Sequence, residues 1–366
     1  MAEDLLSAEG IPFPRALSAT EMGSLLDFCH QISTSEEDVV VLDASELVMM
    51  DPLGLAMFRA VLEKRGGRRY HVNSMYQNLI NYLLQMGFFD GLSVTGLVEQ
   101  PGPLKNENCI KLQKVDAENC EKVASVLAEF VIGQAMGESE ERSDYQHPVE
   151  YALKELLNNA TSHARRNGFW GAGAWVACQY YPSNDSIRLA IVDNGCGFLA
   201  TLENHEALIE PTHAGAIRTA LLERVSCNRG PMLAYETDSQ NQGVGLTTTA
   251  RIAEKADGHL IVASGDAWLN TAKGEPDVTG EANWQGVAIA FSCCQKLLPQ
   301  VRIGDLLPAV DDEIGTVAVV RMFTTAGSVS GCQPPAAFFI CRLPVPSEPT
   351  RRRKPNALGW VVALWS

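Results

Sequence analysis

Residues 155–164 read "ELLNNATSHA" and place Glu155, Asn159 and His163 four residues apart. Residues four apart on a helix share one face, so this spacing predicts a stripe formed by a carboxylate, an amide and an imidazole. We expect the helix to begin near His147-Pro148, because acidic and polar residues at 137–146 break the apolar pattern before it. Its apolar positions recur every three or four residues and predict a face that packs on a sheet: Val149, Leu153, Leu156, Leu157, Ala160 and Ala164.

Two glycine motifs follow this helix, in the stretches "IRLAIVDNGCGF" (187–198) and "NQGVGLTTTARIAEKADGHLIVAS" (241–264). The first is an apolar strand that ends in glycines, and the second opens a helix that leads back into a strand. The residues that mark them are Asp193, Gly195 and Gly197 in the first, and Gly243, Gly245, Leu246 and Thr247 in the second. Neither contains the GxxxxGK[ST] of a P-loop, and both lack the third glycine of GxGxxG. These patterns argue against P-loop and dinucleotide sites.

The order E-x3-N-A-x2-H, D-x-G-x-G-F and G-x-G-L resembles that of the GHKL ATPases, which share the Bergerat fold. This family includes gyrase-type topoisomerases, ninety-kilodalton heat-shock chaperones, MutL proteins, sensor histidine kinases and anti-sigma-factor kinases. The resemblance covers residues 110–295 and implies an α/β sandwich that binds ATP and Mg²⁺. The spelling of the first motif is most similar to anti-sigma-factor serine kinases. One departure is Val287, where many members have threonine, so a polar contact near the nucleotide is expected to be missing.

The chemistry of these residues agrees with the resemblance. A buried carboxylate at Asp193 can accept from the exocyclic amine of adenine. Gly243 and Gly245 precede a helix, whose N-terminal amides suit phosphate oxygens. Mg²⁺ takes oxygen ligands and keeps several waters, so the amide oxygen of Asn159 can supply one ligand. Glu155, one turn earlier, would orient or deprotonate the water that attacks the γ-phosphate.

Simpler interpretations exist for each residue. Glu155 and Asn159 on an isolated helix would be solvated surface, and Asp193 at a strand end would be a turn former. His163 could contact the nucleotide or favour the helix C-terminus through the helix dipole. Gly243 and Gly245 could belong to an ordinary loop. Three arginines between residues 199 and 240 could either contact phosphate or simply face solvent: Arg218, Arg224 and Arg229.

The first hundred residues alternate strand and helix, beginning with the apolar run "DVVVLDA" (38–44) and a helix opened by Pro52. This stretch resembles a STAS domain, the fold of anti-sigma-factor antagonists. In that family a phosphoacceptor serine stands in the turn where this chain has Leu53. Leucine carries no hydroxyl, so the resemblance implies a docking unit, bound to a partner or to the ATPase domain, that is not switched by phosphate.

Composition limits the remaining classes. The net charge of -15 argues against nucleic-acid binding, and no stretch approaches the roughly 20 apolar residues of a membrane span. The ten cysteines form no CxxC pair, and the N-terminus has no apolar signal core, so we expect a cytoplasmic protein with reduced thiols. The predicted organisation is a STAS-like α/β unit (1–95), a linker (96–109), a Bergerat-type α/β ATPase domain (110–295) and an unassigned, irregular tail (296–366).

The sequence leaves three functions open. In the first, the chain binds ATP·Mg, hydrolyses it and acts as a nucleotide-dependent switch. In the second, the same pocket serves a serine/threonine kinase of the anti-sigma-factor type that acts on a separate partner. In the third, it is an ATP-binding module without turnover. A protein partner is expected on the STAS-like unit, and the chain is a candidate homodimer.

Overall fold

Helices and strands are mixed along the chain, which confirms the predicted α/β class. The computed structural model describes residues 10–64, 68–97, 107–133, 140–163, 168–223, 225, 245–301 and 306. The chain divides into two units, Met1–Val310 and Asp311–Ser366, and all of the described residues belong to the first. Most of the predicted linker and tail therefore lies outside the described residues. The 3-10 helix η4 (Gln295–Gln300) begins at the last residue of the predicted ATPase domain and continues into the described part of the tail.

Residues 10–97, called here the N-terminal segment, contain a parallel four-stranded sheet in the order β1-β3-β5-β6. Its strands are β1 (Ile11–Pro12), β3 (Val39–Asp43), β5 (Arg69–Asn73) and β6 (Val94–Thr95). A second, two-stranded sheet pairs β2 (Ala16–Leu17) with β4 (Met49–Met50), and the 3-10 turn η1 (Ala19–Glu21) follows β2. The helices are α2 (Met22–Thr34), α3 (Pro52–Glu63) and α4 (Gln77–Gln85). The predicted strand at 38–44 and the helix start at Pro52 are confirmed.

The rest of the described chain is built on one antiparallel sheet of seven strands, in the order β12-β11-β10-β13-β9-β8-β7. These strands are β7 (Cys109–Val115), β8 (Ala174–Tyr181), β9 (Ser186–Asp193), β10 (His259–Gly265), β11 (Ala267–Asn270), β12 (Pro276–Val278) and β13 (Trp284–Cys294). The helices are α5 (Cys120–Ile132), α6 (Glu140–Asn158), α7 (Gly197–Leu202), α8 (His213–Ala220) and α9 (Gly245–Lys255), with the π-helical turn η3 (Asn159–His163) after α6.

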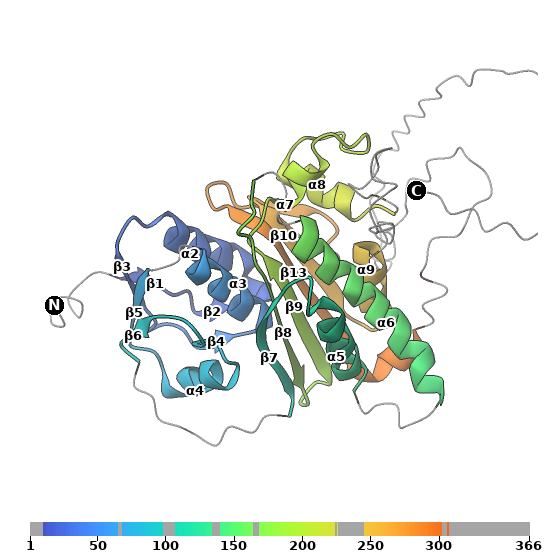
Figure 1. Cartoon of the computed structure of the whole chain (residues 1–366), viewed down its shortest axis with the longest axis horizontal. Helices are drawn as coiled ribbons and strands as arrows, with labels where there is room; N and C mark the ends of the chain where they lie inside the picture. Colours follow the sequence, from blue (N-terminus) through green and yellow to red (C-terminus); the bar gives the residue numbers. More distant parts are fainter. Residues whose placement is uncertain are drawn as a thin grey trace, which may run out of the picture. The chain divides into compact units, whose positions relative to one another are not determined.

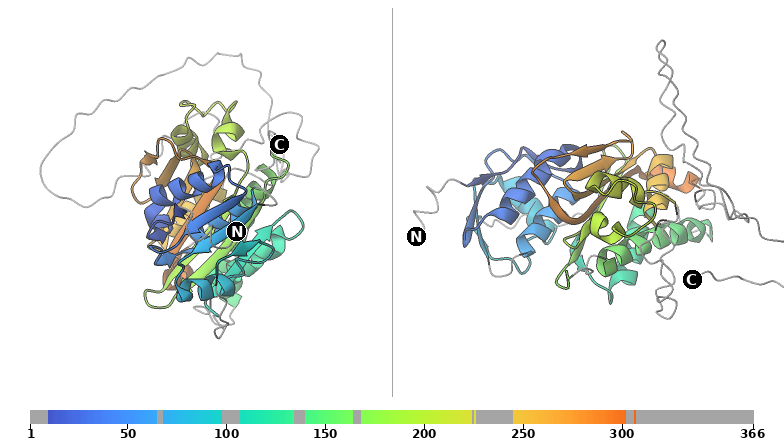
Figure 2. Two further views of the ribbon diagram at one scale, coloured as in Figure 1. Left: turned by 90° about the vertical axis from the view of Figure 1, so that its left-hand side faces the viewer. Right: turned by 90° about the horizontal axis from the view of Figure 1, so that it is seen from above.

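This large sheet is apolar on both faces, and β9 shows how. Side chains alternate across a strand. On one face Ile187, Leu189 and Ile191 join a hydrophobic cluster with α5, α6 and α9. On the other, Ala190 and Val192 join a cluster with α2 and α3 of the N-terminal segment. Figures 1 and 2 show the two groups of helices on opposite faces of the sheet.

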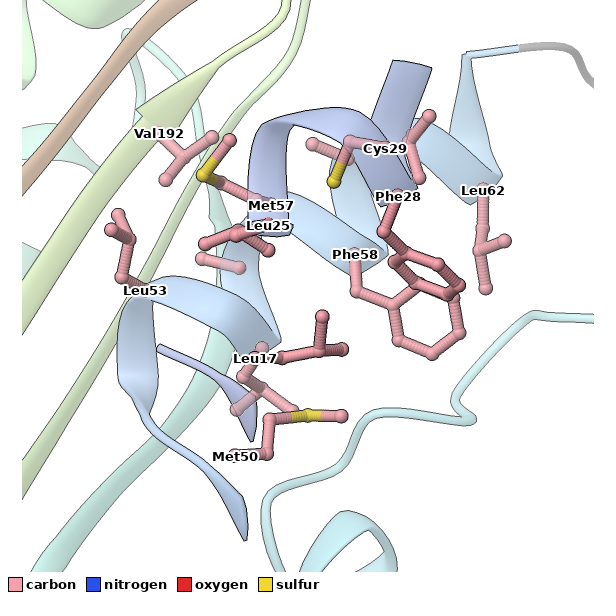
Figure 3. Close-up of a cluster of buried hydrophobic side chains, with 14 of the residues drawn as sticks. Leu17, Leu25, Phe28, Cys29, Met50, Leu53, Met57, Phe58, Leu62 and Val192 are labelled. Atoms are coloured by element: carbon pink, nitrogen blue, oxygen red, sulfur yellow. The ribbon is translucent and has the colours of Figure 1, made fainter. Parts of the chain in front are cut away.

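Helix α3 lies between the four-stranded sheet and the large sheet, and it is buried along nearly its whole length. Its sequence, "PLGLAMFRAVLE", is apolar on all sides, as expected for a helix covered all round. Figure 3 shows Met57 beside Val192 of β9, and Phe58 packed with Phe28 of α2. Leu53, which stands at the expected phosphoacceptor position, is only 1% exposed. The N-terminal segment was expected to dock on a partner or on the ATPase domain. In the structure, α3 packs on the large sheet of the same chain.

Polar contacts at both ends of α3 reach the large sheet. At the C-terminal end, Glu63 accepts from Lys114 of β7 at 3.0 Å and from the Trp175 indole of β8 at 3.4 Å. Burial raises the pKa of Glu63, but the bonds from Lys114 and Arg59 outweigh it and bring this pKa below its ordinary value. At the N-terminal end, the Asp51 carboxylate caps the helix through Gly54 N and lies 3.8 Å from Arg188 of β9. These contacts fix the register of α3 on the sheet.

Replacing Gly54 by alanine should destabilise the fold strongly. A Cβ at this position would lie 2.1 Å from the backbone oxygen of Leu17, which cannot move without shifting β2. We expect the free energy of unfolding, measured in urea, to fall by about 3 kcal/mol. The matched control is Gly23→Ala in α2, where a Cβ meets nothing within 4 Å. It should raise the free energy of unfolding by about 0.5–1 kcal/mol, and equal effects of the two changes would contradict the packing described for α3.

The predicted start of the motif helix is wrong. Helix α6 begins at Glu140, and Pro148 lies inside it. The polar stretch before Pro148 was expected to interrupt the helix, but Glu, Arg and Gln are good helix formers. A proline removes one backbone hydrogen bond, which a helix of 19 residues packed against α5 and α9 can sustain.

Candidate functional site

Glu155 lies on α6, and the residue is only 3% exposed. It meets the start of α9: a Cβ on Gly245 would lie 2.6 Å from the Cβ of Glu155. Only glycine allows the two helices to approach this closely. Figure 1 shows α6 and α9 on the same face of the sheet. The structure therefore brings the E-x3-N-A-x2-H motif and the G-x-G-L motif together, although they are far apart in the chain.

The stripe predicted for α6 is altered beyond Glu155. Residues Asn159–His163 form the π-helical turn η3, in which more residues make each turn than in an α-helix. The Thr161 hydroxyl donates to Leu157 O at 2.9 Å and the Ser162 hydroxyl to Asn158 O at 2.6 Å. Asn159 is partly exposed at the start of this turn, and the side chain of His163 lies outside the described residues. Single π turns inside helices are frequent at functional sites.

Asp193 ends β9 on the face that carries Ile187, Leu189 and Ile191, so it lies on the same side of the sheet as α6 and α9. It is 4% exposed. Its carboxylate accepts from Gly195 N at 2.9 Å and also from the backbone N–H of Val287. Burial raises the pKa of Asp193 from 3.8 to about 7, because the two N–H donors only partly offset the loss of water. A buried carboxylate of this kind can recognise a hydrogen-bond donor on a ligand.

The backbone of Val287 supports Asp193 independently of the side-chain contact that was expected to be missing at this position. Threonine at this position was expected to supply a polar contact that valine lacks. The backbone of residue 287 nevertheless reaches the Asp193 carboxylate. A backbone donor is independent of the side chain, so the substitution leaves Asp193 supported from β13.

Gly197 and Ser264 connect the D-x-G-x-G-F motif to β10. Gly197 opens α7 with φ +75°, a conformation that favours glycine. The Ser264 hydroxyl donates to Gly286 O at 2.9 Å and accepts from Phe198 N at 3.1 Å. Ser264 was visible in the sequence only as the end of a strand. Its partners come from residues far apart in the chain, so no local pattern could have revealed its role.

The N-terminal turn of α9 carries the last part of the G-x-G-L motif. Gly245, Leu246 and Thr247 are buried, and the Thr247 hydroxyl donates to Leu221 O at 3.1 Å. Thr248 is 3% exposed, and its hydroxyl has no hydrogen-bond partner among the described residues. The first N–H groups of any helix lack acceptors inside it, so this turn offers donors to an anion. Gly243, the first glycine of the motif, lies outside the described residues.

Other candidates receive less support as ligand contacts. Arg218 on α8 pairs with Glu210 at 2.7 Å and with Glu275 at 3.2 Å, so its guanidinium is already engaged by carboxylates. Arg224 and Arg229 lie outside the described residues. No cluster of three or more His, Cys, Asp or Glu side chains suited to a metal occurs in the described ranges. The predicted Mg²⁺ site does not require one, since Asn159, phosphate and water would supply its oxygens.

Comparison of the chain with known protein families and with curated protein sequences gave no match. No helix in the described part of the chain is both long and apolar enough to cross a membrane. Three features make up the candidate site: Glu155 against the start of α9, Asn159 on the adjoining π turn, and Asp193 with its surrounding donors.

Proposed function

We propose that the chain binds ATP·Mg and hydrolyses it slowly, as a nucleotide-dependent switch with a GHKL-type pocket. The observation that carries the proposal is the meeting of Glu155 with Gly245 at the N-terminus of α9. A carboxylate normally avoids burial, and this one lies where a bound phosphate chain would be held. Asp193 lies on the same side of the sheet, with a carboxylate suited to the adenine amine.

In this proposal each residue has one task. The amides of Gly245, Leu246 and Thr247 bind phosphate oxygens, with Gly243 preceding them. Asn159 would hold Mg²⁺, which would neutralise negative charge on the phosphates. Glu155 orients or deprotonates the attacking water. Asp193 accepts from the adenine amine, while Gly195 and Gly197 let the chain pass close to the ring, and His163 is a further contact near the nucleotide.

A serine/threonine kinase acting on a separate protein would use the same pocket. The buried position of Leu53 and of the turn around it argues against the N-terminal segment of the same chain as substrate. Incubation with γ-labelled ATP separates the two functions, because an ATPase releases free phosphate and a kinase labels an added protein. Binding without either product would favour the module without turnover. Absence of ATP·Mg binding by calorimetry would refute all three.

Nucleotide affinity should depend on pH through Asp193. Because the pKa is raised to about 7, the carboxylate takes up a proton as the pH falls through neutrality. A protonated carboxyl accepts less well from an amine, so affinity should fall about tenfold between pH 8 and pH 6, in line with the ionised fraction. Calorimetry at several pH values is the measurement. The Asp193→Asn variant reports the titration of the phosphates alone, and a wild-type profile parallel to that of the variant would rule out this role.

A further inference from the structure

The N-terminal segment packs against the end of β9 that carries Asp193. Val192 is fully buried and faces α2 and α3, with Met57 beside it (Figure 3). Asp193 follows directly and faces the other side of the sheet. The backbone between these two residues is therefore held by a contact with a part of the chain more than a hundred residues earlier.

Trp284, the first residue of β13, contacts the same end of β9 from the neighbouring strand. It is 4% exposed and belongs to the hydrophobic cluster that contains Leu25 and Phe28 of α2. Its indole Nε1–H donates to the backbone oxygen of Asp193 at 3.2 Å. The preceding residue, Asn283, donates its backbone N–H to Nδ1 of His30 on α2 at 3.4 Å. The start of β13 thus touches α2 on one side and Asp193 on the other.

We infer that Trp284 is a positioning residue for Asp193, through which the N-terminal segment sets the place of the carboxylate in the pocket. The inference rests on the proposed function of Asp193 in binding the base. Trp284 fixes the backbone of residue 193, and Val287, three residues further along β13, supplies a donor to its carboxylate. A shift of α2 against β13 would therefore move both supports of Asp193 together.

The same contacts make the coupling reciprocal. If the N-terminal segment determines how well the pocket binds nucleotide, nucleotide binding must stabilise the segment by the same free energy. A protein partner on the N-terminal segment would then be sensed in the pocket without touching it.

The test compares Trp284→Phe with Trp268→Phe, a change of the same kind on β11 at the border of the same cluster. Removing the Trp284 N–H should weaken ATP·Mg binding about fivefold in calorimetry. It should also move the titration midpoint of Asp193, followed by carboxyl carbon NMR in the nucleotide-free protein. Trp268→Phe should change neither. In wild type, but not in Trp284→Phe, ATP·Mg should slow amide hydrogen exchange in α2.

Unchanged affinity and an unchanged Asp193 midpoint in a folded Trp284→Phe variant would overturn the inference. If this variant does not fold, replacing the indole by benzothiophene removes the donor and keeps the shape, and the same two outcomes apply. If wild type binds no ATP·Mg while the midpoint still moves, the proposed function fails and the positioning role stands. Nucleotide binding that leaves hydrogen exchange in α2 unaltered would overturn the link to the N-terminal segment.

Discussion

Glu155→Ala is expected to bind ATP·Mg with nearly wild-type affinity and to hydrolyse it at least about 100-fold more slowly. The expected loss is that of a general base, which acts on the attacking water and contributes little to holding the nucleotide. Calorimetry gives the affinity, and phosphate release under single-turnover conditions gives the rate.

Two controls make the result specific to the carboxylate. Glu155→Gln keeps the volume beside Gly245 and removes only the charge, so it should lose hydrolysis without disturbing the contact between α6 and α9. Glu150→Ala removes a carboxylate from the same helix, where the side chain is partly exposed, and should leave turnover unchanged. Wild-type turnover by Glu155→Gln would exclude Glu155 from the chemistry.

Asp193→Ala should weaken ATP binding by about 2–3 kcal/mol or more, which is roughly 30-fold to 150-fold. The adenine amine would lose its acceptor in a buried site, and the N–H groups of Gly195 and Val287 would lose theirs. Isothermal calorimetry with ATP and with a purine that lacks the exocyclic amine measures the effect. The variant should bind the two ligands alike, whereas wild type should prefer ATP.

Asp277→Ala on the exposed strand β12 is the matched control and should leave affinity unchanged. An Asp193→Ala variant that binds ATP as tightly as wild type, while still discriminating between the two ligands, would contradict both the role of Asp193 and the GHKL-type pocket.

Much of the local structure could be predicted from the sequence, because it depends on short-range patterns. The apolar run before Asp43 predicted β3, and Pro52 predicted the start of α3. The strand ending at Asp193 and the helix that begins at Gly245 also lie where the motifs placed them. These features follow from residue spacing, proline geometry and glycine, all of which act within a few residues.

The parts that could not be predicted depend on contacts between distant residues. Nothing near Trp284 in the sequence indicates that its indole donates to Asp193. The sequence of α3 shows that the helix is apolar all round, but not that a second sheet covers it. The π turn after Asn158 has no sequence signature that distinguishes it from a regular helix. Features of this kind follow from the three-dimensional packing of the chain and not from patterns of neighbouring residues.

The position of α3 has a consequence for how the chain is made. During synthesis the residues of α3 (52–63) leave the ribosome long before β8, β9 and β13 (174–294), which cover one side of the helix. Until those strands emerge and pair, Leu53 and Met57 have no apolar surface of the large sheet to pack against. Nascent chains with uncovered apolar surface aggregate or bind chaperones. The N-terminal segment can therefore reach its final packing only late in translation, and a pause or truncation before β13 would leave its most apolar helix without its cover.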